Sequence, residues 1–352
     1  MDNTRFVGEI RNQPSALRAA ADFYTTGEGA GLLARSAGMI GSRQRLVFTG
    51  MGTSLYAPYL IVKELDGMLP SIELRDAGEL LHFGLRGLRD DTILAAVSQS
   101  GESAETRNVV QKAAGKVPIL SIVNNPASFM GRNADLILPL HAGEEAFISA
   151  KTYTNTLAVL LLLSSALRKE SLRVVTGELH MTADIMERNL DVAYEAARSA
   201  VRFFGTTGTL HCIARGSDLV TAHQWALILK EGAGLFTEAL SAGLFRHGPI
   251  ELAGEGHAAA CIVSPGNEPD LTASLAVELC SLGSRVLVLS YGSGERLPVA
   301  PGMMEVRLDS PSPRYFPIMC APFIEMFVHE AAKSRGREAG VFRHATKITS
   351  RE

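Results

Sequence analysis

The chain has 352 residues, of which 46% are hydrophobic and 20% are charged, and its formal net charge is −3. This composition excludes a disordered chain, and the length suits two globular domains of about 150 residues each. So small a charge gives no general attraction for nucleic acid or for an anionic membrane, and we expect neither as a partner.

The chain is predicted, in order, to form two sets of short apolar strands that alternate with helices. The strands are predicted at 45–49, 93–97 and 117–123 in the first half, and at 209–214, 258–263 and 284–290 in the second. Helices are predicted at about 6–24, from 53 to about 64, at 105–114, throughout 171–204 and from 218 to about 231. Matching segments recur after about 165 residues, which is typical of a duplicated domain. Continuous apolar strands separated by helices predict a parallel sheet with helices on both faces.

We therefore expect two tandem, doubly wound α/β domains. The predicted parts are an N-terminal helical segment (1–30), a first domain (31–170), connecting helices (171–207), a second domain (208–340) and a C-terminal tail (341–352).

The compartment and the cofactors are predicted from what the sequence lacks. Its cysteines stand in apolar stretches without metal-ligand spacing, which indicates buried thiols in a reducing compartment: Cys212, Cys261, Cys280 and Cys320. No apolar stretch reaches the length of about 18 residues that a membrane span needs, and the first residues do not resemble a signal peptide. We expect a cytoplasmic protein with no metal site and no cofactor.

A run of small polar residues, Ser98–Ser103, directly follows the predicted strand 93–97 and precedes the helix at 105. Backbone N–H groups at the start of a helix bind anions, and serine hydroxyls add donors without fixed charge. The alternative is a solvated loop with a serine N-cap. The density of hydrogen-bond donors in this short run favours a site for a small phosphorylated molecule.

A second turn, Gly50–Leu55, begins like a dinucleotide-binding motif, and the acidic Glu73 follows about 20 residues later, as that motif requires. However, Leu55 stands where the third glycine of the motif should be. A nicotinamide-dependent oxidoreductase is therefore disfavoured, and the hydroxyls of Thr53 and Ser54 fit a sugar or a phosphate better.

The second half offers candidate proton-transfer groups. The helix from Asp218 ends near Glu231, because Gly232 and Gly234 follow it. A helix C-terminus disfavours the charged form of a carboxylate, which suits a general base, although a solvated surface glutamate is the simpler alternative. His247 follows in a loop, where a single histidine is more often structural than catalytic.

Together these segments resemble the SIS (sugar isomerase) double-domain family, specifically the isomerase half of glucosamine-6-phosphate synthase, over nearly the whole chain. The resemblance rests on Glu9–Pro14, Gly52–Ser54, Ser98–Ser103, Ser149–Thr154, Leu229–Glu231, Glu238–Gly243, Arg246–Pro249 and Ala345–Thr349. The serine run and the spacing from Leu229 to Pro249 are its specific motifs. It implies two SIS-type domains and a homodimer with a shared active site.

The resemblance also implies a role for each site residue. The residues implied to bind phosphate and substrate are Thr53, Ser54, Ser98, Gln99, Ser100, Ser103 and Ser149. Glu231 would move a proton between C1 and C2 of an opened sugar, and His247, donated across the dimer interface, would assist ring opening. Lys347 would enter the site on the tail, contact the carbonyl end and form an imine with a ketose.

Two departures from that family bear on the activity. The chain begins at the segment that resembles the entry helix, so we expect no glutamine-hydrolysing domain and no full synthase activity without a separate source of ammonia. Ile228 stands three residues before Glu231, where the synthase has a lysine, and this changes the charge next to the expected base.

The expected function is that of a phosphosugar isomerase or deaminase acting on glucosamine 6-phosphate, fructose 6-phosphate or a close analogue. The alternatives are a deglycase of 6-phosphorylated sugar–amine adducts and a sugar-phosphate sensor without turnover. The joint presence of Glu231, His247 and Lys347 disfavours the sensor, because a sensor needs no groups for proton transfer.

Overall fold

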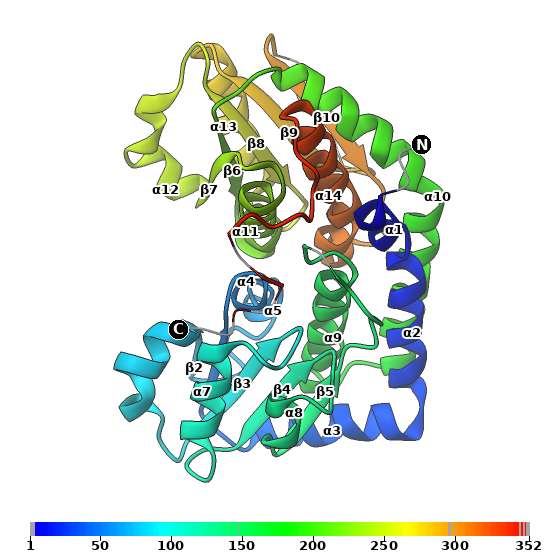
Figure 1. Ribbon diagram of the computed structural model, residues 1–352, viewed down its shortest axis with the longest axis vertical. Coiled ribbons are helices and arrows are strands. Elements are labelled where there is room, and N and C mark those ends of the chain that lie inside the picture. The colour runs from blue at the N-terminus through cyan, green and yellow to red at the C-terminus, as the bar shows by residue number, and fades with distance from the viewer. Residues whose placement is uncertain are drawn as a thin grey trace. The chain divides into compact units, whose positions relative to one another are not determined.

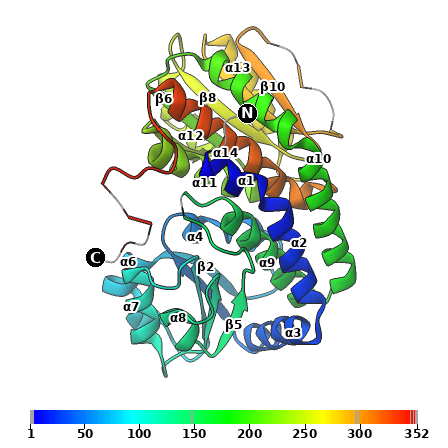
Figure 2. The same ribbon diagram turned by 45° about the vertical axis from the view of Figure 1, so that its right-hand side comes forward.

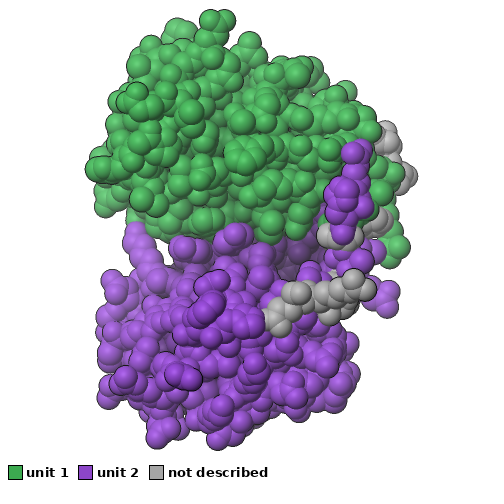
Figure 3. Space-filling view, turned by 60° about the vertical axis from the view of Figure 1, so that its left-hand side comes forward, with its two compact units in different colours: residues 1–14, 181–342 green, residues 15–180, 343–352 purple. Residues whose placement is uncertain are grey.

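The computed structural model describes residues 4–146, 148–294, 297–298, 300–344, 346–347 and 349 (Figure 1). The chain divides into two compact units, coloured separately in Figure 3. Unit 1 comprises residues 1–14 and 181–342, and unit 2 comprises residues 15–180 and 343–352. These divisions fall inside the predicted N-terminal segment and inside the predicted connecting helices.

Unit 2 contains a parallel five-stranded sheet with the strand order β2-β1-β3-β4-β5. Its strands are β1 (Arg45–Gly50), β2 (Ser71–Asp76), β3 (Thr92–Ser98), β4 (Ile119–Val123) and β5 (Leu136–Pro139). Its helices are α2 (Gln13–Thr25), α3 (Gly27–Gly41), α4 (Thr53–Tyr56), α5 (Tyr59–Val62), α6 (Ala77–Glu79), the π-helical turn η1 (Leu80–Gly84), the 3-10 turn η2 (Leu85–Gly87), α7 (Ala104–Ala113), α8 (Phe129–Arg132) and α9 (Lys151–Leu167).

Helices cover both faces of this sheet (Figures 1 and 2). On one face, apolar side chains of β1, β3 and β4 pack against η1, α7 and α8 in a single buried cluster. On the other face α3 packs on β5 and on α9, and α9 is buried along almost its whole length. Its polar first turns and its apolar run Leu157–Leu163 are both buried, so α9 forms part of the core of unit 2.

Unit 1 repeats this architecture with the order β10-β9-β8-β6-β7. Its strands are β6 (Thr209–Ala214), β7 (Phe236–Ser241), β8 (Ala258–Val263), β9 (Arg285–Tyr291) and β10 (Met303–Leu308). Its helices are α1 (Arg5–Arg11), α10 (Leu172–Phe204, which begins in unit 2), η3 (Gly216–Asp218), α11 (Leu219–Ile228), η4 (Leu229–Ala233), α12 (Ala242–Arg246), η5 (Pro249–Leu252), α13 (Pro269–Ser281), η6 (Pro313–Tyr315) and α14 (Phe316–Ser334).

The core of unit 1 also has two layers. One apolar cluster joins β6, β8 and β9 to α12 and α13. On the opposite side α11 packs on the buried α14, where the Trp225 ring meets Phe323 edge-on at 5.8 Å between ring centroids. The first helix belongs to this unit, since Arg11 of α1 pairs with Asp191 of α10 at 2.6 Å. Gln13, which begins α2, also hydrogen-bonds Glu325 of α14.

The two sheets have the same topology when their strands are counted from the first strand of each unit. Each first strand lies second from one edge, and the chain then builds outward in both directions. This confirms the predicted fold class, two tandem doubly wound parallel-sheet domains with helices on both faces. The six predicted strands are all present. Two of them, β6 and β8, have the predicted bounds, and the ends of the others differ by at most two residues.

Two predicted helices are wrong in their extent. The segment 6–24 comprises α1 and α2, which are separated at Asn12. The segment from residue 53 to about 64 is two short helices, α4 and α5, rather than one. Pro58 separates them because proline has no N–H to donate to the preceding turn. By contrast, the predicted helices at 105–114 and 171–204 are confirmed as α7 and α10.

Candidate active site

The residues predicted to bind phosphate come together at one edge of the unit 2 sheet. β1 and β3 are neighbouring strands, and after them the chain continues to opposite sides of the sheet. The carboxyl ends of two such strands form the crevice in which doubly wound proteins bind ligands. Thr53 and Ser54 begin α4 just beyond β1, and Ser98 ends β3, so both groups border this crevice.

The serine loop (Ser98–Ser103) is shaped by two of its own hydroxyls. The Ser98 hydroxyl accepts a hydrogen bond from the Gly101 N–H at 3.1 Å, and the Ser100 hydroxyl accepts one from the Glu102 N–H at 3.1 Å. Gly101 has a φ of +67°, and a Cβ there would lie 2.0 Å from the Ser128 hydroxyl, so only glycine fits. The Ser103 hydroxyl forms no capping bond to α7 and remains available as a donor at this helix start.

The carboxylate within the serine loop is engaged with a neighbouring helix. Glu102 accepts a hydrogen bond at 2.7 Å from the N–H of Phe129, the first residue of α8, and Arg107 lies 3.9 Å from its other oxygen. Its negative charge is therefore partly balanced, and an anion bound to the loop meets less repulsion from it.

The first turn of unit 2 has a packing reason for each of its glycines. A Cβ on Gly50 would lie 2.8 Å from the carbonyl oxygen of Val97, and Gly52 has a φ of +54°.

Glu73, the acidic residue of the disfavoured dinucleotide motif, lies on β2 and pairs with Arg45 at 2.7 Å and Arg75 at 3.3 Å. These pairs, first of all the hydrogen bond from Arg45, lower the pKa of Glu73.

Lys347 of the C-terminal tail lies in unit 2, together with the serine loop. Its ammonium contacts Glu145 at 2.8 Å, and the Thr349 carbonyl accepts a hydrogen bond from the N–H of Ala104 at the start of α7. Ala345 and Ile348 of the tail motif lie outside the described residues. The tail thus reaches the helix that follows the serine loop.

Glu145 was missed by the sequence analysis. Its carboxylate also accepts hydrogen bonds from the N–H groups of Ala150 and Thr152 and from the Thr152 hydroxyl, all within 3.0 Å. It therefore caps the start of α9 from the loop that follows β5, and Ser149 stands in the same turn. An acidic residue that lies five and seven residues before the groups it binds is too common a spacing to identify this cap from the sequence.

Glu231 lies in unit 1, in the π-helical turn η4 that ends α11. The helix therefore continues slightly beyond Glu231 and ends at Gly234, whose φ is +59° and against which Arg337 packs. π-helical turns are often found at functional sites because they displace one side chain from the regular helix surface. Glu231 is exposed, and since η4 leads into β7, it lies at the edge of the sheet where the strands begin.

His247 lies at the opposite edge of the same sheet. It follows α12, which begins directly after β7, and it is exposed. β7 has six residues, so about 20 Å of extended chain separates the edge with Glu231 from the edge with His247. Within a single chain, unit 1 therefore does not bring Glu231 and His247 together.

In unit 1, the side chains that follow β6 and those that follow β8 hydrogen-bond to one another. Asp218 accepts hydrogen bonds from the Ser264 N–H at 3.1 Å and the Ser264 hydroxyl at 2.7 Å, and Asn267 donates to Ser217 at 2.8 Å. These residues follow β6 and β8, the strands that correspond to β1 and β3. A buried carboxylate thus lies where the anion site of unit 2 would be, and the two halves have diverged at this position.

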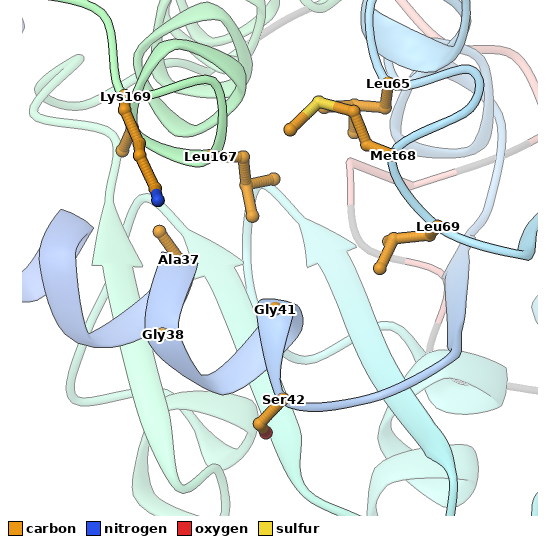
Figure 4. A pocket seen from close by; sticks show the side chains of 10 residues that line it. Ala37, Gly38, Gly41, Ser42, Leu65, Met68, Leu69, Leu167 and Lys169 are labelled. Carbon is orange, nitrogen blue, oxygen red and sulfur yellow. The ribbon is translucent and has the colours of Figure 1, made fainter.

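A hollow of about 460 Å³ in unit 2 lies elsewhere (Figure 4). It is lined by α3, by the segment after α5 with Met68 and Leu69, and by the end of α9 with Leu167 and Lys169. Ser42 and Leu69 precede β1 and β2, so the hollow lies at the edge where the strands begin. None of the predicted site residues lines it.

The described residues contain no group of three or more histidine, cysteine or acidic side chains that could hold a metal ion. No helix among them is long and apolar enough to cross a membrane. The predicted burial of the four cysteines is confirmed, and burial raises the pKa of the Cys261 thiol to about 12.

Residues 39–166 match the model of the SIS domain. The glutamine–fructose-6-phosphate aminotransferase (isomerizing) of Aeropyrum pernix is 29% identical over 98% of the chain, and the chain spans 57% of that relative's length.

Two solved structures share the fold. The C-terminal domain of glucosamine-fructose-6-phosphate aminotransferase from Francisella tularensis has a TM-score of 0.85 and 18% identity, with 97% of this chain and 99% of that chain covered. Glucosamine-6-phosphate deaminase from Thermotoga maritima has a TM-score of 0.74 and 18% identity, with 98% and 99% covered. The match to the SIS model lies within unit 2, and unit 1 repeats the doubly wound fold of that unit.

Proposed function

We propose that the protein is a phosphosugar isomerase or deaminase that acts on a 6-phosphorylated hexose or aminosugar of the glucosamine 6-phosphate or fructose 6-phosphate type. The observation that carries this proposal is the cluster of hydroxyl groups at one edge of the unit 2 sheet, where Thr53, Ser54 and the serine loop follow the ends of β1 and β3. Its relatives among aminotransferases and deaminases of 6-phosphorylated sugars support the substrate class.

In this proposal the serine loop, with Thr53, Ser54 and Ser149, binds the phosphate and the sugar hydroxyls. Hydroxyl and backbone N–H donors suit a phosphate that must be held in a defined orientation. Glu231 takes the proton from C1 or C2 of the opened sugar and returns it to the adjacent carbon. This transfer interconverts aldose and ketose. With an amine at C2 it gives an imine at C2, which water hydrolyses to the ketose and ammonia.

His247 is proposed to come from the partner subunit of a homodimer and to transfer a proton at the ring oxygen. The separation of Glu231 and His247 to opposite edges of one sheet supports this, because a second chain supplies the missing neighbour. The protein would then require dimerisation for activity.

Lys347 is proposed to contact the carbonyl end of the substrate. In the structure it is an ammonium donor to Glu145, and a protonated amine has no lone pair with which to attack a carbonyl. An imine with a ketose therefore requires Lys347 to give up a proton first and ends with loss of water, whereas hydrogen bonding to the substrate requires neither.

The test is incubation of the purified protein with glucosamine 6-phosphate, followed by assays for ammonia and fructose 6-phosphate. Glucose 6-phosphate and fructose 6-phosphate are tested in parallel for interconversion. Formation of either product supports the proposal. Binding of these sugars without any turnover would make the protein a sensor, and failure to bind any of them would overturn the substrate class.

A further inference from the structure

Lys151 is a buried lysine for which the fold supplies no counter-ion. It is the first residue of α9, and only 6% of its surface is exposed. Within the described part of the chain its ammonium forms no hydrogen bond and no ion pair. Its side chain extends to Gly143, where a Cβ would lie 3.7 Å from the Lys151 nitrogen.

Two physical effects oppose a cation at this position. Only a small part of Lys151 reaches solvent, so its ammonium is poorly hydrated, and no described residue compensates its charge. The N-terminus of a helix also carries partial positive charge, so an acidic residue rather than a lysine is favoured in the first turn of α9.

The nearest acid in sequence does not relieve this cost. Glu145 directs its carboxylate to the α9 start at Ala150 and Thr152 and to Lys347 of the tail. The Glu145 carboxylate is therefore already fully used by other groups. An anion from outside the chain is the partner that the position lacks.

Hydrogen bonds connect the position of Lys151 to the serine loop. The Gly143 carbonyl accepts a hydrogen bond from the Asn124 side chain at 2.7 Å, and the Asn124 N–H donates to the Gln99 carbonyl at 3.2 Å. The Lys151 ammonium thus lies beside Gly143, and Asn124 links Gly143 to the serine loop through hydrogen bonds. It lies at the same edge of the sheet, because Asn124 follows β4 as Ser98 ends β3.

We propose that Lys151 is the cationic binding residue for the phosphate group of the substrate. The serine loop contributes only uncharged donors, together with one carboxylate, so a phosphate dianion bound there lacks a balancing charge. A hydrogen bond between an ammonium and a phosphate is about twice as strong as one between neutral groups. This inference rests on the proposed function, since it assigns a residue to the same phosphate site.

The experiment compares the wild type with Lys151→Met, which keeps the length and apolar character of the side chain and removes its charge. Calorimetric titration with glucose 6-phosphate and with inorganic phosphate should show a dissociation constant about tenfold or more higher in the variant. The melting temperature of the unliganded variant should not fall, because the charge that is removed is unfavourable beside the partial positive charge at the start of α9. Lys151→Arg, which keeps the charge, should retain more of the affinity than Lys151→Met.

Lys169→Met is the matched control, since Lys169 is an exposed lysine just beyond the other end of α9. It should leave both titrations unchanged. Wild-type affinity in Lys151→Met, or a lower melting temperature of that variant without ligand, would overturn the inference while leaving the proposed function intact. If the wild type binds neither phosphate compound, the proposed function fails and the inference fails with it.

Discussion

Two buried histidines of unit 1 form a hydrogen-bonded chain that the proposed chemistry does not use. His211 lies 3.0 Å from His257, which lies 2.9 Å from the Ser284 hydroxyl, and Glu238 is 3.6 Å from the far side of His211. Burial, followed by the neighbouring His211, lowers the pKa of His257 to about 4. Burial also lowers the pKa of His211, although Glu238 opposes that shift.

These shifts predict a loss of stability in acid. A histidine with a lowered pKa binds fewer protons in the folded state than in the unfolded state, whose pKa is about 6.5. The contribution of His257 is therefore complete above about pH 6.5 and decreases as the pH falls toward 4, by on the order of 2 kcal/mol. Urea unfolding of the wild type and of His257→Gln at several pH values should show the difference in unfolding free energy narrowing over this range. A constant difference would contradict the assignment.

Individual site residues were harder to predict from the sequence than the helices and strands. The serine loop was found because its residues are adjacent in the chain and their chemistry is evident. Glu145, Lys151 and Asp218 were not found, because their importance depends on burial and on partners that tertiary structure brings close. No local pattern distinguishes a buried lysine without a counter-ion from one on a solvated helix face.

Among the elements, the turn from β3 to α7 determines whether the phosphate site can form. Ala substituted for Gly101 would have a strained φ and would overlap the buried Ser128 hydroxyl, which also caps α8. We expect Gly101→Ala to lower the unfolding free energy by about 3 kcal/mol and to weaken binding of glucose 6-phosphate at least tenfold.

Gly115→Ala is the matched control for this turn. Gly115 has a φ of +74°, but no described atom lies within 4 Å of the position of its Cβ. Only the conformational cost of about 1 kcal/mol should be measured, with no effect on binding. Equal stability losses in the two variants would show that the contact with Ser128 is unimportant.

The central strands were predictable and the edge strands were not. β3 and β8 are buried at every position, and such continuous apolar runs are plain in the sequence. β2, β5, β7 and β10 were missed, and each has intermediate or exposed positions because it lies at an edge of its sheet. Polar residues interrupt β2, β7 and β10, and β5 has only four residues, so none of them gives a long apolar run.

At the scale of the whole molecule, duplication has produced two similar units with different uses. The strand crossover of unit 2 is lined by hydroxyls, whereas that of unit 1 is filled by Asp218, Ser264 and Asn267. One phosphosugar should therefore bind per chain. Calorimetric titration with glucose 6-phosphate measures this ratio, and two equivalent sites per chain would contradict the asymmetry.

The proposed exchange of His247 between subunits predicts complementation. Glu231→Gln and His247→Asn should each be inactive as homodimers. Co-expression of the two variants gives mixed dimers, half of the population, in which one site has both residues intact. About a quarter of wild-type activity is expected. Mixed dimers that are purified through two different tags and remain inactive would contradict donation across the interface.

The central claim is that unit 2 holds the phosphate while Glu231 moves hydrogen between C1 and C2. The most direct measurement is incorporation of deuterium from heavy water at these carbons of a bound 6-phosphorylated sugar, followed by NMR. The wild type and the control Glu255→Gln, an exposed carboxylate of the same unit, should incorporate deuterium. Glu231→Gln should do so about 10²- to 10⁴-fold more slowly with little change in sugar affinity. Incorporation by Glu231→Gln at the wild-type rate would contradict the account.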